Sequence, residues 1–366
     1  MAQQKVTDEQ IVAALNQSKG NRAVAARALG IGTRRMMERV SYLKGQGVPI
    51  PDSSYNGRSE VQSTKVVAPE EPIEFPVLPS GEVDIKELIE RRKKEFARRE
   101  EFEDSRKLIP IKVKSNEPIA IVLLGDPHVD DPGCDLGALQ DDINVICETE
   151  GMYAACVGDL QNGWVGARLS QMWAKQETTA SQAWQLVEWL INSLAGKWMA
   201  LVHGNHDHWA GHGNPLKWIQ KQAGVKVAGD HSVRLEFRFP NGQKVRLAAR
   251  HDWPGQSMWN PTHGQLRAAH LTHHDHIIVS GHRHTGGYQM MRIPATGMIA
   301  HMLQLGSYKI IDSYADQLGL PSRNITPSCT VIIDPEAETE HGLVRVEHST
   351  RTAAEFLAWL REHRAG

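Results

Sequence analysis

The sequence predicts an α/β domain preceded by a small all-α segment. From residue 111 onward, apolar runs of strand length alternate with stretches of helical spacing. The first complete run, Ile119–Leu124, has six apolar residues without a polar break, which is typical of a strand buried on both faces of an α/β sheet. Residues 7–44 show only the apolar spacing of short helices. A length of 366 residues suits one large domain with appendages.

The amino-acid composition limits the classes of protein to which the chain can belong. The net charge of −2 shows that the chain as a whole is not a basic nucleic-acid binder. It has neither an apolar run of membrane-spanning length nor a signal-peptide pattern, so we expect a cytoplasmic protein without a membrane partner. The four cysteines show no CxxC spacing, which favours free thiols in a reducing compartment. Most of the 18 histidines lie between His203 and His301, and this skew favours a metal site.

Residues 1–45 are expected to form a helix-turn-helix. Two short helices precede a turn at Gly30-Ile31, and Thr33 can cap a third, arginine-rich helix that runs to Leu43. The stretch GNRAVAARALGIGTRRMMERV resembles the Fis-type helix-turn-helix, whose third helix enters the DNA major groove. The resemblance implies DNA contacts from residues of the third helix: Thr33, Arg34, Arg35, Glu38 and Arg39.

The charge of this segment agrees with DNA binding. Residues 1–50 carry eight Lys or Arg and three acids, a net charge of +5 in a chain of −2. An excess of this sign favours phosphate contacts. The alternative is a small helical interaction module with a basic, solvated face.

Four further segments complete the expected organisation. Residues 46–81 are proline-rich and form a linker, and residues 82–108 form a highly charged helix. This helix has one thin apolar stripe, so it either docks, pairs with its copy in a homodimer, or is simply solvated. Residues 109–350 form the α/β domain, and residues 351–366 form a C-terminal helix.

Polar side chains follow five of the predicted strands, at the point where each strand ends. The strands are expected at 119–124, 153–157, 198–202, 245–249 (the second strand of a hairpin) and 277–279, and a helix at 181–195 is expected to be capped by Ser181. Strand ends that share one edge of a sheet converge in space. The residues at these ends mix carboxylate, imidazole and one amide, without a thiolate, which favours Mn, Fe or Zn ions. Two metal ions need one bridging carboxylate, and Asp159 is the candidate.

These strand ends resemble the calcineurin-like metallophosphoesterase family. The motifs are DPH at 126–128, GDLQN at 158–162, GNHD at 204–207, a lone strand-end His251 and GHRH at 281–284. They occur in order over roughly residues 115–335. The resemblance implies two mixed β-sheets sandwiched between flanking helices in four layers.

The resemblance also implies two divalent metal ions, with Mn²⁺ expected and Fe, Zn or Ni as alternatives. It assigns the first ion to Asp126, His128, Asp159 and His284. It assigns the second ion to Asp159, Asn205, His251 and His282. The neighbouring residues Asp130, Asp131 and Asp207 are expected to support the ligands or to form turns, and Arg283 to point away from them.

His206 has the position of the residue that protonates the leaving oxygen in this family. Some members carry Asp where Asn162 stands, and there it orients the catalytic histidine. The Asn162 side chain can still accept a hydrogen bond from His206, but it cannot raise the pKa of the imidazole by charge. Four tryptophans follow the motifs on loops and either stack bases or pack: Trp164, Trp209, Trp253 and Trp259.

The leading functional hypothesis is a two-metal phosphodiester hydrolase that acts on DNA, of the kind found in bacterial or phage DNA-processing nucleases. One alternative is a small-molecule or cyclic-nucleotide phosphoesterase that its helix-turn-helix only localises. The other is a DNA-binding regulator with a non-catalytic metallophosphoesterase domain, although the intact set of motifs argues against it.

Overall fold

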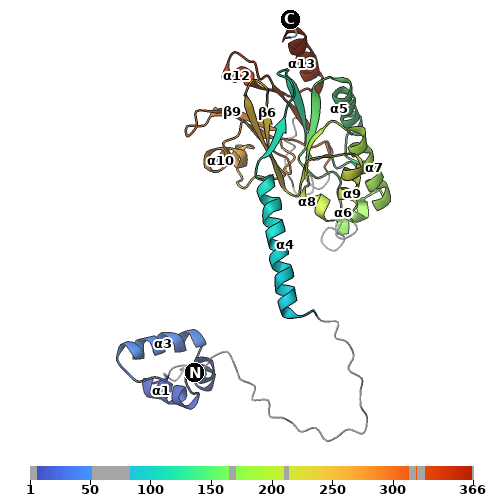
Figure 1. The fold of residues 1–366 in the computed structure, drawn as a ribbon. Helices are drawn as coiled ribbons and strands as arrows, with labels where there is room; N and C mark the ends of the chain where they lie inside the picture. The colour runs from blue at the N-terminus through green and yellow to red at the C-terminus, as the bar shows by residue number, and fades with distance from the viewer. Residues whose placement is uncertain are drawn as a thin grey trace. The chain divides into compact units, whose positions relative to one another are not determined.

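The computed structural model describes residues 6–51, 83–164, 170–209, 214–312, 319 and 326–364. The chain divides into two compact units, Met1–Glu82 and Val83–Gly366 (Figure 1). We call their described parts the three-helix unit and the two-sheet domain. The linker predicted at 46–81 lies outside the described residues from position 52 onward. No helix in the described parts of the chain is long and apolar enough to cross a lipid bilayer.

The three-helix unit has its own apolar core. Its helices are α1 (Asp8–Gln17), α2 (Arg22–Ala28) and α3 (Thr33–Gly45). Ile11 and Leu15 of α1 pack with Met36 and Val40 of α3. The predicted cap of the third helix is wrong: Gly32 is the N-cap, without a side-chain hydrogen bond, and Thr33 is the first helical residue.

The two-sheet domain contains two mixed six-stranded sheets. The first has the order β1-β6-β7-β8-β10-β9, and the second has the order β12-β11-β2-β3-β4-β5. In the second sheet β2 to β5 run parallel, while β11 and β12 are antiparallel additions. In the first sheet β7, β8 and β10 run parallel, and the hairpin of β6 and β7 is antiparallel. The strands are β1 (Ile109–Lys112), β2 (Ile119–Leu124), β3 (Met152–Cys156), β4 (Trp198–Val202), β5 (Ala228–Gly229), β6 (Ser232–Arg238), β7 (Lys244–Arg250), β8 (Ile277–Ser280), β9 (Gly287–Arg292), β10 (Ile299–Gln304), β11 (Ser328–Ile333) and β12 (Val344–Glu347).

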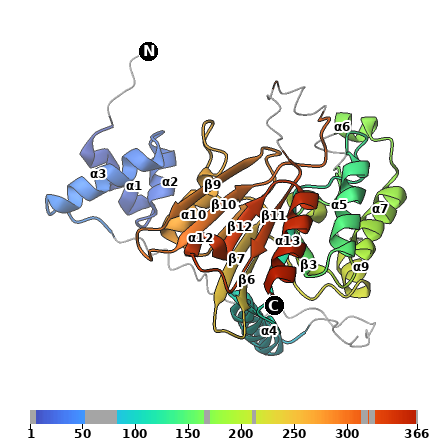
Figure 2. The ribbon, with the colours of Figure 1, turned by 90° about the horizontal axis from the view of Figure 1, so that it is seen from above.

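The described helices of the two-sheet domain range in length from 4 to 22 residues. They are α4 (Ile85–Arg106), α5 (Leu136–Glu148), α6 (Ser170–Lys175), α7 (Ala180–Ser193), α8 (Asn205–His208), α9 (Leu216–Gln222), α10 (His263–Leu271), α12 (Glu340–Leu343) and α13 (Thr350–Arg364). The view from above shows α5, α7 and α9 on one side of the sheets, and α10 and α12 on the other (Figure 2). The predicted α/β class, with two mixed sheets between flanking helices, is therefore confirmed.

The position of strand β2 in the fold explains why all of its residues are apolar. Ile121 and Leu123 face the core between the two sheets, where they meet residues such as Phe237. Val122 and Leu124 face the other way, into the core beneath α5, α7 and α13. Every residue of β2 is buried because it separates two cores.

Some predicted elements differ in detail. The N-cap of α7 is Thr179, which forms a capping box with Gln182, rather than Ser181. Strands β9 and β12 were not predicted, since β9 alternates exposed and half-buried residues at a sheet edge and β12 has four residues. The charged helix α4 buries none of its residues, and its apolar stripe at Ile85, Ile89 and Phe96 is exposed.

Candidate metal centre

The predicted ligands come from the ends of strands in both sheets. Asp126, Asp159 and Asn205 follow β2, β3 and β4, which are adjacent and parallel in the second sheet. His251 and His282 follow β7 and β8, which are adjacent and parallel in the first sheet. The expectation that the strand ends share one sheet edge is therefore wrong. The ligands converge because the carboxyl ends of these strands meet at one end of the sandwich.

The backbone at this site is unusual. Four predicted ligands have a positive φ: His128 (44°), Asp159 (52°), His282 (70°) and His284 (48°). The described parts of the chain contain one further non-glycine residue of this kind, Lys19. A left-handed backbone costs a side chain about 1–3 kcal/mol, so it persists where surrounding structure or function requires it.

Close approach of the loops explains two of the glycines in the motifs. A Cβ atom on Gly204 would lie 2.0 Å from Asp159 Oδ1, and one on Gly281 would lie 2.5 Å from Asp126 Oδ1. The loops are also tied together by the backbone, since His128 N donates to the Asp159 carbonyl at 3.0 Å. Glycine is required at both positions so that the carboxylates can approach the neighbouring strand ends.

The first half of the centre contains Asp126, His128 and His284, beside Asp159. His284 Nε2 lies 3.2 Å from His128 Nε2 and 3.6 Å from Asp126 Oδ2, and His128 Nε2 lies 3.9 Å from Asp159 Oδ2. Asp126 Oδ1 and His128 Nδ1 are buried and have no hydrogen-bond partner among the described residues. Buried polar atoms without partners are costly, and a bound cation among these side chains would satisfy the carboxylate. The residues therefore fit a metal ion.

The second half is built around His251. Its Nε2 atom lies 2.9 Å from Asn205 Oδ1, 3.1 Å from His282 Nδ1 and 3.2 Å from Asp159 Oδ2. Its Nδ1 atom lies 2.9 Å from the Val157 carbonyl, which fixes the ring so that Nε2 faces the ligands. Asp159 therefore belongs to two His/Asp groups that could hold metal ions, as a bridging ligand requires.

Burial and neighbouring charges shift the pKa values of the side chains in the centre. Burial lowers the pKa of His128 and His206, which favours the neutral ring that binds a metal. Burial raises the pKa of Asp126 to about 6. Burial also opposes protonation of His251, but its hydrogen bond to the Asp159 carboxylate raises its pKa to about 10. Metal binding would release the proton that His251 shares with Asp159.

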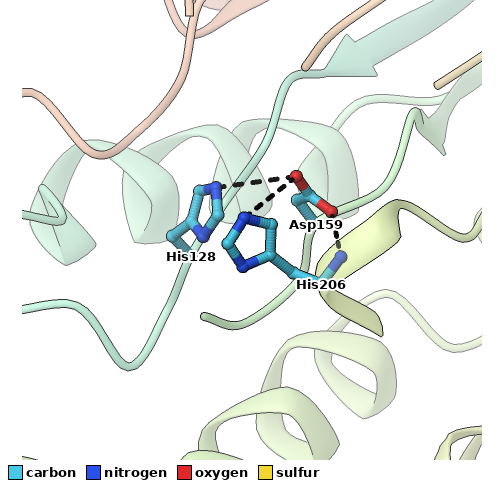
Figure 3. Close-up of side chains that lie close together, drawn as sticks. All are labelled: His128, Asp159 and His206. Atoms are coloured by element: carbon cyan, nitrogen blue, oxygen red, sulfur yellow. Dashed lines mark hydrogen bonds and ion pairs between the residues drawn. The ribbon is translucent and has the colours of Figure 1, made fainter. Parts of the chain in front are cut away.

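His206 lies above Asp159 at the edge of the first half. Figure 3 shows its ring and that of His128 directed at the Asp159 carboxylate, with 3.9 Å between His206 Nε2 and Asp159 Oδ2. The His206 backbone N–H donates to Asp159 Oδ1 at 3.0 Å. These distances place His206 among residues that could hold a metal, as well as in reach of a reacting group.

Asn162 contacts His206 in a way that the sequence did not predict. The backbone carbonyl of Asn162, rather than its side chain, contacts His206 Nδ1. The Asn162 side-chain amide instead donates to Asp131 Oδ2 at 2.9 Å and to Gln176 Oε1 at 3.0 Å. A carbonyl that orients the ring belongs to the backbone, so the exchange of Asp for Asn at this position leaves it unchanged.

The four loop tryptophans fall into three environments. The Trp209 and Trp164 rings lie 4.1 and 5.2 Å from the His206 ring, centre to centre. Trp253 is buried and its Nε1 donates to the Val279 carbonyl, so it packs in the domain. Trp259 is 88% exposed. Of the four, Trp164 and Trp209 are therefore the two that face the centre.

Supporting residues hold the ligand loops. Asp207 accepts hydrogen bonds from the backbone N–H groups of Asp159, Leu160 and Gly204 at 2.8–3.0 Å, which agrees with its expected supporting role. Burial raises the pKa of Asp207 to about 7. Arg283 points away from the centre, as expected, and its guanidinium donates to Asp252 Oδ1.

Two residues near the first half were missed by sequence reasoning. His284 Nδ1 lies 3.3 Å from Asp312 Oδ2, and the buried Lys309 Nζ lies 3.1 Å from both Asp312 Oδ1 and Asp131 Oδ2. Both follow the strand β10 by several residues, without a motif that could have indicated them.

A third His/Asp cluster, His203, His208 and Asp230, was also missed. His203 Nδ1 lies 3.3 Å from Asp230 Oδ1. The Lys217 ammonium lies 3.4 Å from the same oxygen, so the carboxylate already faces a cation. The arrangement supports the loop and does not call for a metal.

The predicted DNA-contacting residues all lie on the exposed side of α3, and they differ in their partners. Thr33, Arg34 and Arg35 are exposed, and Arg34 pairs with Glu38 of the same helix at 3.2 Å. Arg39 instead forms two hydrogen bonds with the Asp8 carboxylate of α1, at 2.5 and 2.6 Å. Arg39 therefore joins two helices of the unit.

Comparison with known proteins gives limited information. No protein-family profile matches the sequence, and no curated protein matches it. The chain is similar to the NAD nucleotidase NadN of Haemophilus influenzae, with 12% identity and a TM-score of 0.34 over 63% of this chain and 49% of that one. It is also similar to the calcineurin-like phosphoesterase YfkN of Bacillus subtilis, with 14% identity and a TM-score of 0.34 over 67% of this chain and 99% of that one. Similarity at this level identifies neither a family nor a function.

Proposed function

We propose that the two-sheet domain is a two-metal phosphodiester hydrolase of the calcineurin-like metallophosphoesterase type, and that its substrate is DNA. The observation that carries the proposal is the backbone conformation of the predicted ligands. Four predicted ligands adopt the left-handed conformation beside an Asp126 oxygen that is buried without a hydrogen-bond partner among the described residues. Apolar packing explains neither feature, whereas a site that binds cations explains both.

The proposed ligands divide into two sets that share Asp159. Asp126, His128 and His284 would hold one ion with Asp159, and Asn205, His251 and His282 would hold the other. The ions, with Mn²⁺ the leading candidate and Fe, Zn or Ni as alternatives, would supply Lewis-acid activation of water and neutralise charge on the phosphoryl oxygens.

The side chains around the ions have separate tasks. The Asn162 carbonyl holds the Nδ1 side of His206, so Nε2 is the atom turned toward the centre. The neutral ring carries its proton on Nδ1, so we propose that the doubly protonated ring, which the nearby Asp159 carboxylate favours, gives its Nε2 proton to the leaving oxygen. The rings of Trp164 and Trp209 pack beside the His206 ring and help to hold its orientation.

DNA as the substrate is supported by the rest of the chain. The three-helix unit exposes Arg34 and Arg35 on α3 and belongs to a segment with a net charge of +5. Trp164 and Trp209 offer ring faces beside the centre on which a base could stack.

The test is a substrate panel with the full chain and Mn²⁺: linear and circular DNA, RNA, cyclic nucleotides and bis(p-nitrophenyl) phosphate. We expect hydrolysis of DNA and of the dye, and both activities to need the metal. Hydrolysis of cyclic nucleotides alone would support the small-molecule alternative. Binding of DNA without hydrolysis of any substrate would support the regulator alternative.

A further inference from the structure

A second feature of the two-sheet domain is a basic cavity beside the candidate metal centre. The cavity has a volume of about 850 Å³ and is lined by the last turns of α4, by α9, and by β5, β6 and β7. Six Lys or Arg residues line it, against two acids, Glu103 and Asp230. The basic residues are Arg99, Arg106, Lys107, Lys217, Arg234 and Arg250. This excess of positive charge is local, because the chain as a whole has a net charge of −2.

Of these six cations, three pair with a carboxylate and three do not. Arg234 pairs with Asp275, Lys107 with Asp104 and Lys217 with Asp230. Within the described parts of the chain, the remaining three form no ion pair: Arg99, Arg106 and Arg250. Arg106 donates to the Ala228 carbonyl and lies over the Phe102 ring, and Arg250 donates to the Asp252 carbonyl and lies over the Trp253 ring. These contacts hold both side chains in place without neutralising their charge.

Short stretches of backbone connect the lining of the cavity to two predicted metal ligands. Arg250 immediately precedes His251, and the His251 N–H donates to the carbonyl of His231, which lines the cavity, at 3.1 Å. His203 lines the cavity two residues before Asn205. The cavity therefore adjoins the half of the centre that contains Asn205 and His251.

We propose that this cavity binds the phosphate backbone of a polynucleotide on one side of the phosphate that is hydrolysed. The inference rests on the proposed function and deepens it. Separated cations on several elements match successive phosphates of a strand better than the single phosphate of a small ester. The contacts are to the backbone, so they increase affinity for any sequence.

The test compares two single variants of the full chain. Arg99→Gln removes an exposed cation that lines the cavity and has no ion pair among the described residues. The matched control, Arg98→Gln, makes the same change of charge at an exposed position of the same helix that does not line the cavity. Binding of a fluorescein-labelled 20-mer is measured by anisotropy in EDTA over a range of salt concentrations. Hydrolysis of the 20-mer and of bis(p-nitrophenyl) phosphate is measured with Mn²⁺.

We expect the cavity variant to raise the Kd and the KM for the 20-mer by about three-fold, since one phosphate contact is lost. The slope of log K against log salt should become shallower by about one. Hydrolysis of the dye should stay as in the unchanged chain, and the control variant should change none of these values. Equal effects of the two variants, or no effect of the cavity variant, would overturn the inference.

A failure of the proposed function gives a different result. The unchanged chain would then leave the 20-mer intact, whether or not it hydrolyses the dye. The anisotropy measurement needs no catalysis, so it still decides whether the cavity binds the strand.

Discussion

The two-sheet domain and the three-helix unit each bury an apolar core, but they treat their polar residues differently. In the two-sheet domain, Asp126 and Asp159 are fully buried and His128 adopts a left-handed backbone. In the three-helix unit, the charged residues are at the surface, and Arg39 pairs with Asp8. The comparison teaches that the three-helix unit keeps its charges in water, whereas the candidate metal centre buries carboxylates and strained backbone that a bound cation would explain.

The largest expected effect is a loss of catalytic turnover, which depends on the two-sheet domain. His206→Ala should lower the turnover of DNA about a hundred-fold or more, because the proposed proton donor is lost. The loss should be smaller for a substrate with a nitrophenolate leaving group, which needs no proton. Steady-state kinetics on both substrates, with metal content measured on the same samples, provide the test.

His208→Ala is the control for this variant, since His208 lies on the same loop but is exposed and contacts the Asp230 carbonyl. An equal loss on both substrates, together with a loss of metal, would make His206 a ligand rather than a proton donor.

The second expected effect is that a fall in pH destabilises the two-sheet domain more than the three-helix unit. All 18 histidines lie from His128 onward, so the three-helix unit has none. In the two-sheet domain, burial lowers the pKa of His276 and of His301 to about 4 from the ordinary 6.5. Each ring stays neutral in the folded state while the unfolded chain takes up a proton, so stability is lost as the pH falls from 6.5 toward 4. Each histidine should destabilise the domain by about 2 kcal/mol between pH 7 and pH 5.

Hydrogen exchange resolved by segment should therefore show acid sensitivity in the two-sheet domain and little in the three-helix unit over this range. His276→Asn keeps an acceptor for the Arg246 N–H and should reduce the sensitivity, whereas the exposed His270→Gln should not. Equal sensitivity of both regions would contradict the role assigned to the buried histidines.

The smallest effect distinguishes two arginines of the same helix. Arg35→Gln should make the salt dependence of DNA binding shallower by about one and leave the melting temperature unchanged, since Arg35 is exposed. Arg39→Gln should instead lower the thermal stability of the three-helix unit, because its hydrogen bonds to Asp8 are lost. Anisotropy titrations and segment-resolved hydrogen exchange distinguish these results. The reverse pattern would place Arg39, rather than Arg35, on the DNA.

The sequence predicted much of the fold because burial leaves a direct pattern. Ile119–Leu124 could be read as a doubly buried strand, and the residues after it as candidate ligands. The division of the strand ends between two sheets could not be read, because strand order depends on contacts that are distant in sequence. Edge strands such as β9 were missed, since half of their residues face solvent.

The sequence also could not predict contacts that are made by the backbone or by side chains distant along the chain. The contact of Asn162 with His206 uses a carbonyl that every residue has, so its side chain was misleading. Asp312 and Arg39 have partners 28 and 31 residues away, and nothing in their local sequence indicates them.

The central claim is that Asp159 belongs to two metal sites at once. The most direct measurement is the metal content of the full chain after loading with Mn²⁺ and removal of free ions, for the unchanged chain and for Asp159→Asn. The account predicts close to two ions per chain, and the loss of most of both in the variant, because the amide cannot replace the carboxylate between the two groups. One tightly held ion in the unchanged chain, retained in full by Asp159→Asn, would contradict it.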